Sequence, residues 1–125
     1  MTRTLAFLFV LILPSVTFAA DPFSGRWVGQ WSSDANGHHG PLRATLTPTA
    51  TGYTTTFTGR FAKVVPFVYR TPLDVVGASE DTVFLAAERR LPLFGTFRTD
   101  AVVTPFSFDA TFRSGRDSGR FTLTR

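Results

Sequence analysis

Apolar and polar residues alternate along most of the chain after residue 24, with the period of two expected of strands that bury one face. Within this alternation Trp27, Gly29 and Trp31 share a face, and so do Leu73, Val75 and Gly77. The segments are also rich in threonine, valine and phenylalanine, as strands commonly are. The alternating segments are residues 27–31, 42–47, 53–61, 73–77, 83–87, 106–112 and 120–124. The pattern predicts an all-β protein.

Turn-forming residues separate these segments. Residues 34–37, with the sequence DANG, form a strong turn signal because Asn and Gly tolerate positive φ angles. About eight short strands with short connections favour a small antiparallel up-and-down barrel of the calycin or lipocalin type. Closure removes exposed strand edges, so we expect the strands that begin near Gly25 and Gly119 to pair. A membrane-spanning barrel is disfavoured, since one face of most strands carries Thr, Arg and Ser.

The N-terminus has the layout of a secretory signal peptide. Arg3 precedes an apolar run over residues 5–13, Pro14 ends the run, and small residues follow up to Ala19. We therefore predict a signal peptide over residues 1–19 and a single barrel domain over residues 20–125, exported to the periplasm or secreted. The run is too short to span a membrane, and we expect no transmembrane segment in the mature chain.

Composition narrows the chemistry that the chain can perform. It has no cysteine, which excludes disulfides, thiolate nucleophiles and Cys-ligated metals. The net charge is +4, and Lys63 is the only lysine, so the basic surface consists of arginine, which suits carboxylate, sulfate or phosphate groups. An exported domain without a dense basic stripe is not expected to bind nucleic acid.

Residues 25–27, with the sequence GRW, resemble the G-x-W motif that opens the first strand of lipocalin- and avidin-like barrels. In those families the tryptophan closes the barrel floor and a late arginine packs over it. The resemblance implies a structural role for Trp27, with Arg120 or Arg125 as the covering arginine; we assign Arg120.

Three longer segments resemble a family of small exported bacterial proteins that has no assigned function. They are residues 37–44 (GHHGPLRA), 59–67 (GRFAKVVPF) and 91–97 (LPLFGTF). Similar members often carry cysteines, which this chain lacks. The resemblance implies the compartment and the size of the protein and no mechanism.

The sequence offers no catalytic constellation. His38 and His39 are adjacent, so in an extended chain they point to opposite sides and do not chelate one ion. Catalytic zinc needs three protein ligands, and neither histidine lies in a nucleophile motif. We therefore expect no enzyme activity, no metal site and no cofactor.

These observations favour an exported binding protein that holds a small apolar ligand inside the barrel or at its mouth. The predicted ligand-binding residues are Trp31, Phe57, Phe61, Tyr69, Phe97 and Phe108. The alternative is a protein-interaction module of the cell envelope, or an exported inhibitor, with a solidly packed barrel. A cavity of roughly 300 Å³ or more would favour the ligand carrier.

Three apolar stretches are interrupted by proline, which cannot donate to a strand ladder and marks bends or barrel rims. An exposed apolar patch of this kind commonly binds a partner. We predict that Phe67 and Phe94 lie in contact at one rim. The predicted rim or partner surface consists of Pro66, Phe67, Leu93, Phe94 and Phe106.

Overall fold

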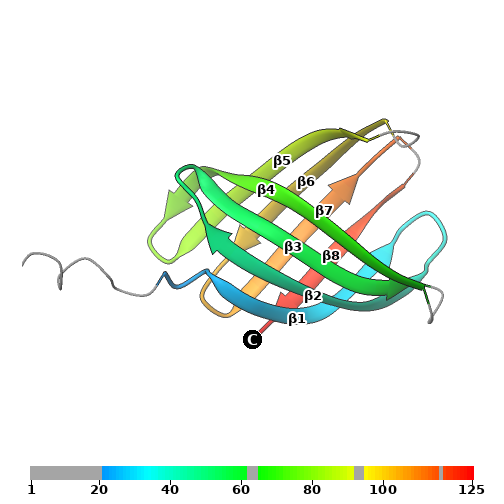
Figure 1. The fold of residues 1–125 in the computed structure, drawn as a ribbon, viewed down its shortest axis with the longest axis horizontal. Coiled ribbons are helices and arrows are strands. Elements are labelled where there is room, and N and C mark those ends of the chain that lie inside the picture. The colour runs from blue at the N-terminus through cyan, green and yellow to red at the C-terminus, as the bar shows by residue number, and fades with distance from the viewer. Residues whose placement is uncertain (1–20, 62–64, 92–94, 116) are drawn as a thin grey trace, which may run out of the picture.

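The computed structural model describes residues 21–61, 65–91, 95–115 and 117–125, and the predicted signal peptide lies outside these residues. The described chain folds into eight strands without a helix (Figure 1). The strands are β1 (Gly25–Ser33), β2 (His39–Pro48), β3 (Gly52–Phe61), β4 (Val65–Ser79), β5 (Thr82–Leu91), β6 (Gly95–Val103), β7 (Ser107–Arg113) and β8 (Ser118–Thr124). The all-β prediction is confirmed.

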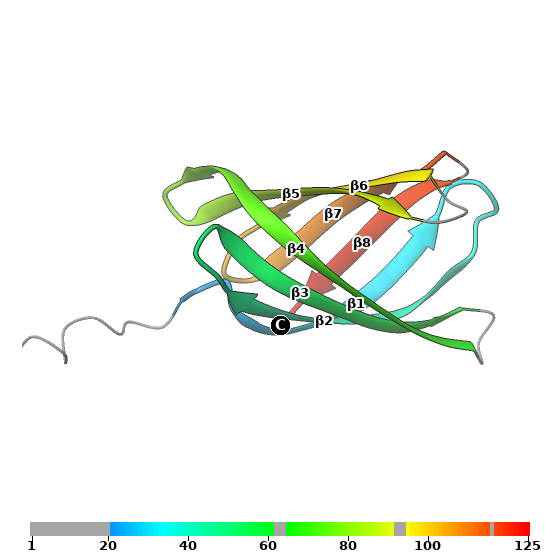
Figure 2. The ribbon, with the colours of Figure 1, turned by 45° about the horizontal axis from the view of Figure 1, so that its top comes forward.

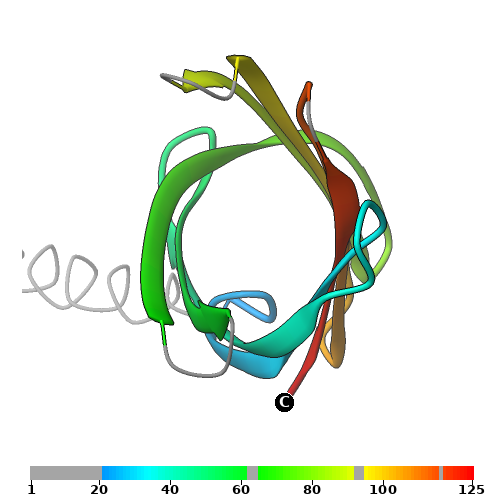
Figure 3. The ribbon, with the colours of Figure 1, turned by 90° about the vertical axis from the view of Figure 1, so that its right-hand side faces the viewer.

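The eight strands form a closed antiparallel barrel in which each strand pairs with its neighbour in sequence. β1 pairs with β8 from Val28↔Thr124 to Ser33↔Gly119 and so closes the barrel, as predicted (Figure 3). Gly29 makes this closure possible, because a Cβ atom there would lie 1.8 Å from the Thr122 carbonyl oxygen. The two strands therefore approach more closely than any larger residue permits.

One end of the barrel, the floor, is sealed by the start and the end of the domain. Trp27 is fully buried, and its indole N–H donates to the Phe23 carbonyl at 3.1 Å. The guanidinium of Arg125 lies over the Trp27 ring, 4.1 Å from its centroid, and donates to the carbonyls of Ser24 and Pro105. The predicted structural role of Trp27 thus has a packing basis.

The assignment of Arg120 as the covering arginine was wrong. Arg120 is exposed on the outer face of β8, whereas its neighbour Phe121 and also Leu123 are buried. Side chains alternate along a strand, so a residue next to inward Phe121 points outward. Arg125 follows Thr124, at the floor end of the strand, and reaches Trp27.

Two other predicted faces differ from the structure. Val75 is exposed although Leu73 is buried, because a β-bulge shifts the pairing of β4 with β5 between Val75 and Gly77. Phe106 is also exposed, because the turn between β6 and β7 includes it and the inward alternation of β7 starts at Phe108. A period of two predicts facing only while the ladder stays regular.

β4 and β5 diverge toward the other end of the barrel, the mouth (Figure 2). Their ladder runs from Asp74↔Ala86 to Ser79↔Thr82, and among the described residues it does not continue into residues 65–73 of β4 or 87–90 of β5. We call these two unpaired stretches the ladder gap. Residues 65–73 of β4 still pair with β3 on their other side.

Replacing Gly29 with alanine is expected to destabilise the fold by about 1–3 kcal/mol, because the new methyl group would push β1 away from β8. Chemical denaturation followed by circular dichroism measures the change. Gly77→Ala is the matched control, since a Cβ atom there meets only Phe84 at 3.4 Å. Equal stability of the two variants would contradict the tight closure.

Replacing Trp27 with alanine is expected to lower the free energy of unfolding by roughly 3–5 kcal/mol, because a large side chain that is fully buried leaves a cavity. Thermal and urea denaturation measure the loss. A Trp27→Ala protein that unfolds at the midpoint of the parent would show that the ring does not support the floor.

Candidate functional site

Five aromatic side chains form a closed belt across the barrel interior. The ring centroids of Phe57 and Tyr69 lie 6.3 Å apart, those of Tyr69 and Phe97 5.5 Å, and those of Phe97 and Phe112 5.8 Å. Phe112 and Phe121 stack at 5.1 Å, and Phe121 returns to Phe57 at 4.9 Å. The belt lies between the packed floor half and the mouth.

Above the belt lies a cavity of about 280 Å³ at the mouth, which we call the cup. Aromatic side chains supply most of its wall, and polar residues of the β1–β2 and β7–β8 connections complete one side. The lining residues are Trp31, Ser33, Asn36, His38, Phe61, Phe67, Phe112, Asp117 and Phe121. An apolar cavity with a few polar groups at its edge is typical of a small-molecule site.

Asp117 holds the polar side of the cup together. Its carboxylate accepts hydrogen bonds from the Ser33 hydroxyl at 2.8 Å and from the backbone N–H groups of Ser118 at 2.7 Å and Ala35 at 3.3 Å. Ser33 is buried, so its hydroxyl requires a partner. These bonds fix the β1–β2 turn against the start of β8.

Trp31 is held in place by a hydrogen bond to a backbone carbonyl that has no N–H partner on the neighbouring strand. The β2–β3 ladder ends at Leu42↔Gly59, one residue before Pro41, which has no N–H to donate. The Arg60 carbonyl instead accepts the indole N–H of Trp31 at 2.9 Å. This bond orients the Trp31 ring over the cup, where it meets Phe67 edge-on at 6.4 Å.

The predicted ligand-binding residues divide into three groups. Trp31 and Phe61 line the cup, while Phe57, Tyr69 and Phe97 belong to the belt. Phe108 lies below the belt, fully buried against Trp27 at 6.0 Å between ring centroids. Phe108 therefore does not line the cup, because Phe57 and Trp27 pack against it.

The predicted rim is only partly brought together. Phe67 lines the cup and packs near Phe61 at 6.2 Å, and Pro66 is exposed beside it. Phe106 was wrongly placed at this rim, since its turn lies at the floor end, where Arg125 reaches Pro105. Leu93 and Phe94 lie outside the described residues. The predicted contact between Phe94 and Phe67 therefore stays a prediction.

Several lining residues were not singled out from the sequence. Phe112 and Phe121 were placed on inward faces by alternation, but nothing in the pattern separated them from core residues. Ser33 ends β1 and Asp117 lies in the β7–β8 connection, and only the closure of the barrel brings them together; His38 was considered for metal binding and catalysis, not for this cavity.

Comparison with protein-family models, with curated proteins and with solved structures finds no match for this chain.

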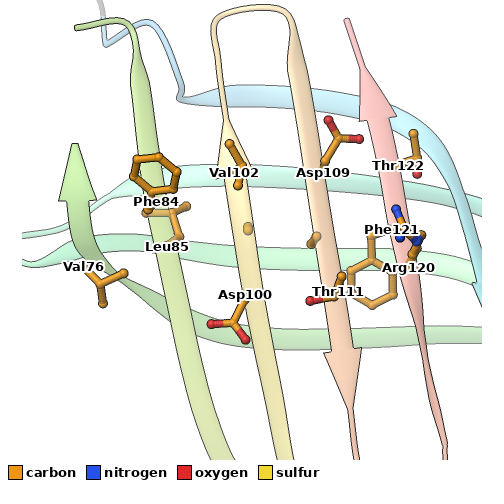
Figure 4. Close-up of a pocket in the computed structure, with 12 residues that line it drawn as sticks. Val76, Phe84, Leu85, Asp100, Val102, Asp109, Thr111, Arg120, Phe121 and Thr122 are labelled. Atoms are coloured by element: carbon orange, nitrogen blue, oxygen red, sulfur yellow. The ribbon is translucent and has the colours of Figure 1, made fainter. Parts of the chain in front are cut away.

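A second hollow, of about 340 Å³, lies over the outer side of β5–β8 (Figure 4). Exposed apolar side chains of Val76, Phe84 and Val102 border it, together with Asp109 and Arg120. Asp100 also lines it, but Arg98 donates to its carboxylate at 2.8 and 3.0 Å, which lowers the pKa of Asp100.

The described part of the chain holds no cluster of three or more His, Cys, Asp or Glu side chains that could ligate a metal ion. Nor does any helix there have the length and apolar character to cross a membrane. The cup itself contains one histidine and one carboxylate, and the carboxylate is occupied by the turn. Its surface is suited to binding apolar groups.

Replacing Asp117 with alanine is expected to destabilise the protein by about 1.5–3 kcal/mol, because the buried Ser33 hydroxyl and two backbone N–H groups lose a charged acceptor. Urea denaturation measures the change. Asp34→Ala is the control, because among the described residues that exposed carboxylate accepts one side-chain hydrogen bond, from the Ser118 hydroxyl at 3.1 Å. A cost no larger than that of the control would contradict the bracing role.

Proposed function

We propose that this protein is an exported, non-enzymatic binding protein that holds a small apolar ligand in the cup. The observation that carries the proposal is an aromatic cavity of about 280 Å³ at the mouth of a barrel that is filled below it. Trp31, Phe61 and Phe67 would form the upper wall, and Phe112 and Phe121 the base. The proposed export rests on the signal peptide that the first 19 residues resemble.

The shape of the site limits the ligand. Its volume of about 280 Å³ lies just below the range for small-molecule pockets, roughly 300–1,000 Å³, so only a small ligand would fit. The belt prevents a ligand from reaching the floor, because Phe57 is buried and contacts rings on both sides. We therefore propose a ligand with a compact apolar body that packs against aromatic faces and keeps any polar group near the mouth.

Binding of the neutral apolar dye N-phenyl-1-naphthylamine tests the proposal, because its fluorescence rises when it leaves water. We expect saturable binding to the parent protein. Phe67→Ser should weaken binding by about tenfold or more, since it removes a large apolar wall from the cup. Trp31→Leu should weaken it as well, because the anchored indole is lost.

Phe84→Ser is the matched control, since Phe84 is a phenylalanine on the outer face of β5, away from the cup. Circular dichroism and thermal denaturation establish that each variant is folded. Absence of saturable dye binding, or an equal loss in Phe84→Ser and Phe67→Ser, would contradict a ligand site in the cup.

A protein-interaction module is the second candidate, favoured by the exposed apolar side chains around the outer hollow. Val76 is 67 % exposed, Val102 42 % and Phe84 39 %, on adjoining strands. Such a patch commonly marks a partner surface. In this alternative, Phe84→Ser would reduce partner binding and Phe67→Ser would leave it unchanged.

A further inference from the structure

The ladder gap between β4 and β5 is maintained by the covalent chemistry of β4. Neighbouring residues of an antiparallel strand direct their backbone groups to opposite sides. The Val75 N–H donates to Thr51, on the β3 side, whereas the Arg70 carbonyl accepts a hydrogen bond from β5. Even-numbered residues of this regular stretch therefore face β5, and these include Pro66 and Pro72.

Proline has no N–H, so neither Pro66 nor Pro72 can donate to β5. The β4–β5 ladder ends at Asp74, and the next even-numbered residue toward the mouth is Pro72. The edge of β4 that faces the gap is thus prevented from forming a continuous ladder with β5. The same prolines protect this edge against pairing with another chain.

A single side-chain hydrogen bond between described residues joins the two strands across the gap. Arg89 of β5 donates from Nη1 to the Arg70 carbonyl of β4 at 2.7 Å. Arg89 lies in the same alternation as the inward residues Leu85 and Ala87, so it belongs to the interior face of β5. Its guanidinium carbon lies 6.0 Å from the centroid of the Tyr69 ring, at the outer limit of a cation–π contact.

The charge of Arg89 is not neutralised within the described structure. Ion pairs there involve Arg98 alone, with Glu88 at 3.7 Å and Asp100 at 2.8 Å. The remaining acids toward the mouth, Asp34 and Asp117, accept hydrogen bonds from serine hydroxyls. The other five of the nine acids lie toward the floor: Asp21, Asp74, Glu80, Asp81 and Asp109.

A guanidinium that pairs with no acid among the described residues therefore stands at the wall of the barrel, beside two aromatic rings of the belt. Tyr69 and Phe97 are only half-buried there, and their rings meet edge-on at 5.5 Å. Phe67, two residues before Tyr69 on the same face of β4, continues this apolar surface into the cup. A planar cation next to an apolar surface matches a molecule with an anionic head and an apolar body.

We propose that the ligand is an anionic amphiphile whose carboxylate or sulfate head is bound by Arg89 at the ladder gap, while its apolar body occupies the cup. This inference rests on the proposed function and specifies the ligand class of the same site. Arg89 would keep its bond to the Arg70 carbonyl through Nη1 and offer its other N–H groups to the head. The prolines would keep β5 from closing over this position.

Displacement of N-phenyl-1-naphthylamine by ligands of equal chain length tests the proposal. The competitors are decanoate, decyl sulfate, 1-decanol and decyltrimethylammonium. We expect both anions to compete about tenfold or more better than 1-decanol, and the cation to compete worst. Arg89→Gln should remove the advantage of the anions and leave competition by 1-decanol unchanged, and Arg89→Lys should retain part of the advantage.

Arg90→Gln is the matched control, because it removes the same charge from the next position of β5, on the outer face. Loss of the anion advantage in Arg90→Gln as well would show a general effect of net charge and overturn the assignment to Arg89. Equal competition by anion and alcohol in the parent would overturn the ligand class while the cup remained a binding site. Failure of the dye to bind would instead refute the proposed function itself.

A free amphiphile and a lipid headgroup share this chemistry, and a second arm separates them. Sedimentation with vesicles of phosphatidylglycerol, compared with phosphatidylcholine, measures attachment to a lipid surface. Decanoate competition without sedimentation supports a free ligand. Sedimentation with the anionic vesicles that Arg89→Gln abolishes, without decanoate competition, would overturn the free ligand in favour of a headgroup.

Discussion

The aromatic belt is the constraint on which the rest of the barrel depends. An eight-stranded barrel has an interior that side chains can just fill, and here five rings from five strands meet in a closed circuit with centroids 4.9–6.3 Å apart. Below the belt the interior is packed down to Trp27. Above it the described side chains leave the cup open. The belt thus serves both as the upper part of the core and as the base of the candidate site.

Prolines at strand edges determine where the wall of the barrel changes. Pro41 ends the β2–β3 ladder and Pro72 ends the β4–β5 ladder, each by removing one backbone donor. At Pro41 the Trp31 indole supplies the missing donor to the Arg60 carbonyl, and beyond Pro72 the Arg89 side chain of β5 donates to the Arg70 carbonyl of β4. The two hydrogen bonds place an indole and a guanidinium toward the mouth, where an apolar body and an anionic head could be held.

The floor shows the opposite arrangement, because side chains of Asp21, Trp27 and Arg125 close this end of the barrel. The Tyr53 hydroxyl donates to the Asp21 carboxylate at 2.8 Å, and burial together with this carboxylate raises the pKa of Tyr53 well above its usual range. Arg125 and the Trp27 indole tie the segment before β1 to the core. The asymmetry between a sealed floor and an open mouth directs a ligand to one end only.

The sequence by itself determined the strand class, the closure of β1 on β8 and the burial of Trp27, because a period of two and local turn chemistry are properties of neighbouring residues. It could not separate belt residues from cup residues, since Phe61, Phe108 and Phe112 carry the same alternation. Nor could it find the bulge at Val76 or the pairing of Asp117 with Ser33, which are 84 residues apart, and it could not choose correctly between Arg120 and Arg125 as the arginine over Trp27. Those features depend on how far each strand runs past its neighbour in the closed barrel, and only the tertiary structure decides that distance.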